Sequence, residues 1–125
     1  MKRILIIEDD PITAKFYRTL LEKEGCQVEV ATDGQKGFDR LVESKPDGVL
    51  LDLMLPSQSG NVLIQKIRAL DGFKDLPIVA FTNAFVTPMV DGALRSGATK
   101  VYDKSSITRL MLIEAFRDKA AASTA

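Results

Sequence analysis

Five polar residues that could act together fall at the ends of short apolar runs: Glu8, Asp9, Asp52, Thr82 and Lys104. Three carboxylates brought to one place would repel one another, so a site built from them needs a cation. Ligand sets made only of oxygen atoms favour a hard cation such as Mg²⁺. A single Lys offsets only part of the negative charge. The residue types therefore predict a divalent cation site.

The composition excludes several other chemistries. The chain has 125 residues and no His, which removes the commonest metal ligand, the usual general base of Ser or Cys triads and any phosphohistidine intermediate. Seventeen Lys and Arg balance seventeen Asp and Glu, so no overall positive field favours direct nucleic acid binding. Cys26 is the sole cysteine and is expected to be inert packing. The apolar run at residues 4–7 is too short for membrane insertion or a signal sequence, so we expect a cytoplasmic protein.

Apolar runs and helical stretches alternate along the whole chain, which is typical of a parallel α/β sheet. The expected strands are residues 3–7, 26–30, 48–53, 78–82 and 100–103. The second strand alternates apolar and polar residues, as an edge strand does. These features predict a doubly wound, flavodoxin-like (βα)5 fold with strand order 2-1-3-4-5 and helices on both faces. Ligands in such sheets bind beyond the carboxyl ends of strands one and three, where the acidic residues lie.

Caps and apolar periodicity predict the helices that cover this sheet. Asp10-Pro11 is a typical N-cap and first helical position, and Thr87-Pro88 is a second such pair unless its helix begins a turn earlier. The last helix is expected over 107–119. We expect one domain over 1–119 and a disordered tail over 120–125. The apolar helix residues expected to pack are Ile12, Phe16 and Leu20, then Phe38, Leu41 and Val42, then Val62, Leu63, Ile67 and Leu70, and finally Ile107, Leu110 and Met111.

Several motifs together resemble a two-component response regulator receiver domain of the single-domain, chemotaxis-regulator type. They are IIEDDP at 6–11, Asp52 followed by LMLP and Gly60, FT at 81–82, and Lys104. The resemblance implies that Asp52 accepts a phosphoryl group from a histidine kinase or a histidine phosphotransfer protein. It also implies that the chain catalyses only this transfer and its own dephosphorylation.

The resemblance implies roles for the other site residues. Mg²⁺, for which Mn²⁺ could substitute, would be bound by Asp9, by Glu8 through water, by Asp52 and by the backbone carbonyl of Met54. Lys104 and Thr82 would contact the phosphoryl oxygens, and movement of Thr82 would begin a conformational switch. The output would pass to a downstream protein target, because the chain carries no recognisable DNA-binding module. The expected output face comprises the fourth helix, fifth strand and fifth helix, with these candidates: Val86, Val90, Tyr102, Thr108 and Leu112.

Two departures from the family pattern affect the switch region. The aromatic switch residue usually lies three positions before the Lys, where this chain has Val101, and the tyrosine is next to it at Tyr102. Because alternate strand residues face opposite ways, we expect both residues to pack as ordinary strand residues, although they remain the switch candidates together with Thr82. Ser105 replaces a proline that usually follows a cis bond, so the bond after Lys104 is either trans in a reshaped loop or a strained cis bond.

Three further departures affect the phosphoryl group. Asn83 stands where a small residue is common, and it could crowd the phosphoryl group or offer it an amide. Met54 and Ala84 cannot hydrogen-bond an attacking water, which predicts slow dephosphorylation.

Three alternative functions remain open at this stage. A flavin-binding electron carrier needs a phosphate loop where this chain has acidic residues 8–10. An aspartate-nucleophile Mg²⁺ phosphatase usually has a second aspartate at the position of Met54. A pseudo-receiver, which has the fold but acts as a phosphorylation-independent interaction module, is the strongest alternative.

Overall fold

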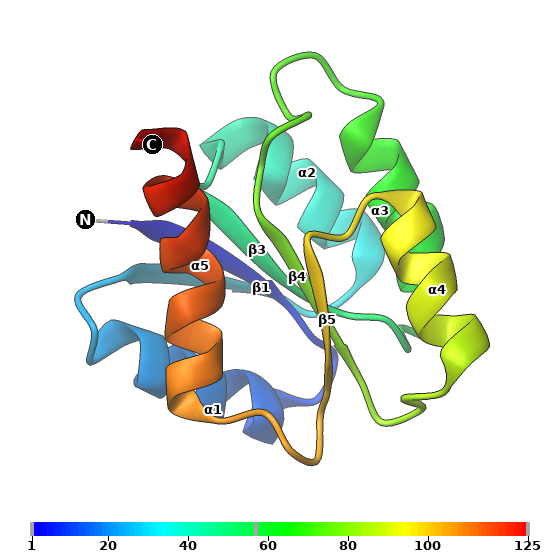
Figure 1. Ribbon diagram of the computed structural model, residues 1–125, viewed down its shortest axis with the longest axis horizontal. Helices are drawn as coiled ribbons and strands as arrows, with labels where there is room; N and C mark the ends of the chain where they lie inside the picture. Colours follow the sequence, from blue (N-terminus) through cyan, green and yellow to red (C-terminus); the bar gives the residue numbers. More distant parts are fainter. Residues whose placement is uncertain (1, 57, 125) are drawn as a thin grey trace.

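A computed structural model of the chain describes residues 2–56 and 58–124, with side chains described as far as residue 117. Five parallel strands form one sheet with the order β2-β1-β3-β4-β5, as the sequence predicts (Figure 1). The strands are β1 (Arg3–Ile7), β2 (Gln27–Ala31), β3 (Gly48–Asp52), β4 (Ile78–Thr82) and β5 (Lys100–Asp103). The helices are α1 (Pro11–Glu22), α2 (Gly34–Ser44), α3 (Gly60–Arg68), α4 (Thr87–Ser96) and α5 (Arg109–Thr124).

Apolar content fixes the place of each strand in the sheet. Every residue of β3 and β4 is buried, which fits strands covered on both faces, whereas β2 lies at an edge and exposes Gln27. β2 begins one residue later than predicted, because the Cys26 N–H bonds to the Leu21 carbonyl and so closes α1. Cys26 is half-buried, and burial raises the pKa of its thiol, so little reactive thiolate forms.

The helices divide between the two faces of the sheet. α1 and α5 cover one face, and α2, α3 and α4 cover the other (Figure 1). The two groups of helices therefore bury two separate apolar cores, one on each side of the sheet.

Several predicted helix faces are wrong. In α1 the buried residues are Ala14, Tyr17 and Leu21, whereas Ile12 and Phe16 are 79% and 61% exposed. Apolar residues occupy two sides of this helix, and the shape of the sheet, not the periodicity, selects one of them. The same reason applies to three residues that are exposed although we expected them to pack: Val42, Val62 and Leu110.

The last helix differs from the prediction at both ends. α5 begins at Arg109, because Ser106 and Ile107 donate their N–H groups to the Asp103 carbonyl in the preceding turn. Its buried residues are Leu112, Ala115 and Phe116, not the predicted stripe. The helix continues past residue 119 to Thr124, and residue 125 lies outside the described residues. The domain boundary and the disordered tail stay predictions.

The N-caps agree with the sequence in one helix and differ in another. Asp10 is the N-cap of α1, where its carboxylate accepts hydrogen bonds from the Ile12 N–H at 3.3 Å and the Thr13 hydroxyl at 2.5 Å. In α4, Val86 is the N-cap and Thr87 is already helical, so the predicted Thr87 cap is wrong by one residue.

Candidate active site

The carboxyl ends of β1 and β3 bring the acidic residues together. Glu8 follows β1 and is fixed by a 3.0 Å hydrogen bond from its N–H to the Ala31 carbonyl of β2. Asp52 is the last residue of β3, and its Oδ1 accepts the Met54 N–H at 2.9 Å. Both carboxylates are buried, whereas Asp9 is exposed. The predicted convergence of Glu8, Asp9 and Asp52 is therefore confirmed.

The turn after β3 is packed closely enough to need a glycine. The Gly60 N–H bonds to the Leu53 carbonyl at 3.0 Å, and a Cβ added at Gly60 would lie 2.7 Å from Leu53 Cα. This close approach holds the segment after Asp52 in place. The side chain of Met54 is 53% exposed in this segment. Its carbonyl stays a predicted ligand.

Lys104 supplies the positive charge of the site. Its backbone N–H bonds to the Thr82 carbonyl at 3.0 Å, which ties the end of β5 to the end of β4. The ammonium Nζ lies 2.6 Å from Glu8 Oε1 and 3.1 Å from Asp52 Oδ2. One cation thus bridges two buried carboxylates, as the grouping of these residues at the strand ends predicts.

Burial and mutual contacts change the pKa values of Glu8 and Lys104. Burial is the main cause that raises the pKa of Glu8 to about 7, and the neighbouring Asp52 carboxyl adds to the effect. For Lys104, burial lowers the pKa, but hydrogen bonds and charge from Glu8 and Asp52 outweigh burial, so the pKa is raised. Lys104 therefore stays charged at neutral pH, while Glu8 changes its charge near pH 7.

The donor set fits a hard divalent cation. Glu8, Asp9 and Asp52 each offer a carboxylate oxygen, and these oxygens all lie within 4.8 Å of one another. All three donors are oxygen, and the ammonium of Lys104 already occupies a position where cations are attracted. A cleft of about 520 Å³ opens on the α1 side of the site, and its lining includes Glu8, Asp9, Asn83 and Lys104. Asp10 also lines this cleft, but its carboxylate caps α1, as predicted.

Thr82 lies at the end of β4 and is completely buried. Its hydroxyl oxygen accepts the Ala84 N–H at 3.0 Å, so the hydroxyl can still donate its own proton. A hydroxyl donor at this strand end has the chemistry needed to bind a phosphoryl oxygen.

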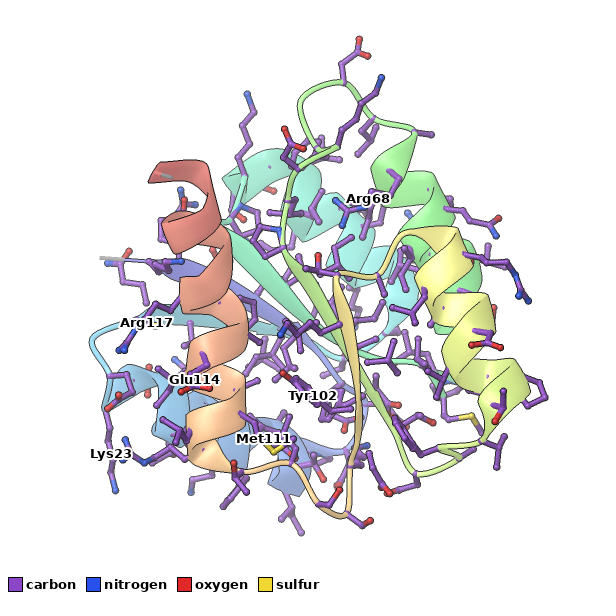
Figure 2. All side chains as sticks on the ribbon, viewed as in Figure 1. Lys23, Arg68, Tyr102, Met111, Glu114 and Arg117 are labelled. Carbon is purple, nitrogen blue, oxygen red and sulfur yellow. The ribbon has the colours of Figure 1, made fainter. Side chains whose placement is uncertain are left out.

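The switch candidates lie on opposite sides of β5. Val101 packs against the core under α2, α3 and α4. Tyr102, which is labelled in Figure 2, packs against the core under α1 and α5. This arrangement agrees with the expected strand packing of both residues. The bond between Lys104 and Ser105 is trans, and Ser105 donates both its N–H and its hydroxyl to Asp103 Oδ1. Of the two alternatives for this bond, the structure therefore contains the trans form.

One of the output candidates is excluded by burial. Leu112 is completely buried against the sheet, so it cannot contribute to an exposed output face. Val86 and Thr108 are exposed, and the Thr108 hydroxyl accepts the Met111 N–H at 3.1 Å in the first turn of α5. Val90 and Tyr102 are partly exposed.

Sequence analysis missed the role of one residue beside the site, because it quoted Phe81 only as part of the FT motif at residues 81–82. The Phe81 ring is buried, and its centroid lies 4.9 Å from Lys104 Nζ. Because Phe81 precedes Thr82 in the sequence, its nearness to the site could have been predicted. The sequence contains no signal for the contact between the ring and the ammonium.

Known proteins with similar sequences include response regulators, in agreement with the fold and the acidic site. The sequence model of the response regulator receiver domain matches residues 4–116, so the chain belongs to that family. The DNA-binding dual master transcriptional regulator RpaA of Synechocystis is 40% identical over 82 residues, 66% of this chain and 34% of RpaA. The polar-differentiation response regulator DivK of Brucella anthropi is 28% identical over 116 residues, 93% of this chain and 94% of DivK.

A solved structure supports the fold. A response regulator receiver domain protein of Clostridium thermocellum superimposes with a TM-score of 0.90 at 21% identity, covering 99% of this chain and 98% of that one. This chain spans about a third of RpaA but nearly all of DivK. None of the helices among residues 2–56 and 58–124 is long and apolar enough to cross a membrane.

Proposed function

We propose that this chain is a phosphoacceptor switch in which Asp52 receives a phosphoryl group from a phosphohistidine of a partner histidine kinase or histidine phosphotransfer protein. The observation that carries the proposal is the buried Asp52 carboxylate, held 3.1 Å from Lys104 Nζ within the acidic cluster. The lack of His in the chain agrees with this role, because the phosphohistidine must then come from another protein.

In the proposed reaction, a carboxylate oxygen of Asp52 attacks the phosphorus atom of the donor. The bond between phosphorus and the imidazole nitrogen breaks, and its electron pair stays on that nitrogen, so the donor His is released and Asp52 carries an acyl phosphate. Lys104 neutralises charge on the phosphoryl oxygens, and the Thr82 hydroxyl donates to one of them. Mg²⁺ held by Glu8, Asp9, Asp52 and the Met54 carbonyl, or Mn²⁺ in its place, would neutralise the remaining negative charge when bound.

The proposed output is a change of the surface that a downstream protein target binds. Phosphorylation can shift a conformational equilibrium only by its different interaction with the two states, and the buried Thr82 is the residue that would sense it. Direct nucleic acid binding is not part of the proposal. A cytoplasmic location is proposed with it, as the sequence leads us to expect.

Intact-mass spectrometry after incubation with acetyl phosphate tests the proposal. We expect one phosphoryl group to be added to the unaltered chain in Mg²⁺, and none without a divalent cation or in Asp52→Asn. Treatment with hydroxylamine should remove the group, because acyl phosphates react with it and phosphoserine does not. The exposed Asp71→Asn is a matched control that should be phosphorylated normally.

An unaltered chain that gains no phosphoryl group would contradict the proposal. If Mg²⁺ binding were absent as well, the result would favour the pseudo-receiver. Asp9→Asn serves as a second test, because it replaces an exposed, negatively charged ligand by a neutral amide without disturbing the buried carboxylates. We expect this variant to need more Mg²⁺ for the same rate.

A further inference from the structure

The ring of Phe81 contacts the ammonium group that the proposed reaction requires. Lys104 Nζ lies over the ring, 4.9 Å from its centroid. A cation near the face of an aromatic ring is attracted by the negative potential of that face, and the attraction grows when water is excluded. Both conditions hold here, since Phe81 is completely buried and the Lys104 side chain is only 14% exposed.

Phe81 is held in place by the same elements that carry the acceptor. It pairs in register with Asp52 across β3 and β4, and its carbonyl accepts the Leu53 N–H at 3.0 Å. The ring of Tyr17 from α1 packs edge-on against it, with the centroids 5.1 Å apart and an angle of 82° between the planes. Edge-to-face packing of this kind fixes the ring plane, so the face turned to Lys104 is constant.

We propose that Phe81 is a positioning residue that keeps the Lys104 ammonium at the phosphoryl site while the charges around it change. This inference rests on the proposed function. In the resting protein, Glu8 and Asp52 hold the ammonium. During the proposed reaction Asp52 becomes an acyl phosphate, and Glu8 would become a ligand of the divalent cation, so both ionic contacts weaken when Lys104 is needed. The neutral ring of Phe81 does not change, so it becomes the contact that restrains the ammonium in the reacting state, whereas the two carboxylates already restrain it in the resting state.

The shape of the Lys side chain explains why such a contact matters. Its ammonium is a compact charge at the end of a flexible four-carbon stem, so many positions are accessible to it. An aliphatic residue at position 81 would fill the same core but offer no attraction to a cation. An aromatic ring restricts the ammonium to the region over its face.

Stepwise fluorination of the ring at position 81 tests the proposal. Fluorine withdraws the negative potential of the ring face with little change of shape, so a merely space-filling role would be unaffected. We would incorporate mono-, di- and trifluorophenylalanine and measure phosphorylation by acetyl phosphate in saturating Mg²⁺. We expect kcat/KM to fall in steps, by about five- to thirtyfold with the trifluoro ring. The thermal midpoint of the metal-free chain should change little, because Glu8 and Asp52 hold the ammonium there.

The chain contains a matched control for this series. Lys66 Nζ lies 4.7 Å from the centroid of Phe38, between α2 and α3, and among the described residues this lysine forms no ion pair with Glu8, Asp9 or Asp52. The same fluorinated residues at Phe38 should leave the rate unchanged within about twofold. If fluorination at Phe81 also left kcat/KM unchanged, in a chain that is phosphorylated normally, the proposal would be overturned.

A measurement without phosphorylation separates this proposal from the proposed function. In the metal-free protein, the ring current of Phe81 should shift the ε-methylene proton resonances of Lys104 upfield, and Phe81→Leu should abolish that shift. If the unaltered chain accepts no phosphoryl group, the proposed function fails, and the NMR shift decides the positioning on its own. Resonances of Lys104 at ordinary lysine positions would refute the positioning in that case.

Discussion

Replacing Glu8 with Gln is expected to remove a pH dependence of stability that the fold itself creates. Glu8 is completely buried, and burial together with the neighbouring Asp52 raises its pKa from 4.5 to about 7 in the folded chain. Between these two values, the folded chain holds a proton that the unfolded chain has lost. The free energy of unfolding therefore falls as the pH rises through this interval.

The size of the effect follows from the same pKa values. Each pH unit across the interval lowers the free energy of unfolding by up to about 1.4 kcal/mol. Complete ionisation of Glu8 therefore lowers it by on the order of 3 kcal/mol by about pH 8. Gln has nearly the same shape and no charge to bury. The Glu8→Gln variant should accordingly gain about this much stability, relative to the unaltered chain, between about pH 4.5 and pH 8.

Urea unfolding followed by circular dichroism, with EDTA present, measures this difference at each pH. The matched control is Glu114→Gln, which makes the same chemical change at an exposed position on α5 (Figure 2). The control should follow the unaltered chain at every pH, while the Glu8→Gln curve diverges from it. Parallel curves for Glu8→Gln and the unaltered chain would refute the assignment of a buried, proton-holding Glu8.

Three other predictions follow from particular side chains. Asp10→Ala should lower the free energy of unfolding by about 1 kcal/mol through loss of the α1 cap, yet leave Mg²⁺ affinity by titration calorimetry unchanged, and a large loss of affinity would contradict the capping role. Leu112→Ala should cost about 2 to 5 kcal/mol because the side chain is buried, whereas Val86→Ala, at an exposed position, should cost less than about 0.5 kcal/mol in the same urea unfolding assay. The acyl phosphate should persist for minutes or longer in Mg²⁺ and hydrolyse faster in Met54→Asn, and hydrolysis within seconds in the unaltered chain, followed by mass spectrometry, would contradict this expectation.

The sheet and the acidic site could be predicted because each depends on local signals that agree with one another. Continuous apolar runs distinguish buried strands from the alternating edge strand β2, and the order of the strands follows from that difference. Once the order is known, Glu8 and Asp52 must meet, because the carboxyl ends of parallel strands lie at one edge. The capping role of Asp10 was predictable for a similar reason, since it depends on neighbouring residues alone.

Features that depend on tertiary packing could not be predicted in this way. Helix α1 carries apolar side chains on two sides, so periodicity gives no basis for choosing Tyr17 over Phe16 as the buried aromatic. The buried face of α5 failed similarly, because Leu110 and Leu112 are equally apolar in the sequence. The contact between Phe81 and Lys104 depends on a side-chain direction that is set by Tyr17 from another element.

The sheet separates the core under α2, α3 and α4 from the core under α1 and α5, so the two halves of the molecule can change independently. Side chains under α2, α3 and α4 can be exchanged without repacking those under α1 and α5. The ring that contacts Lys104 belongs to the second core, whereas α4, with the exposed Val86 at its cap, covers the first. Substitutions on the α4 side could thus create a new binding surface while the residues around Asp52 stay unchanged.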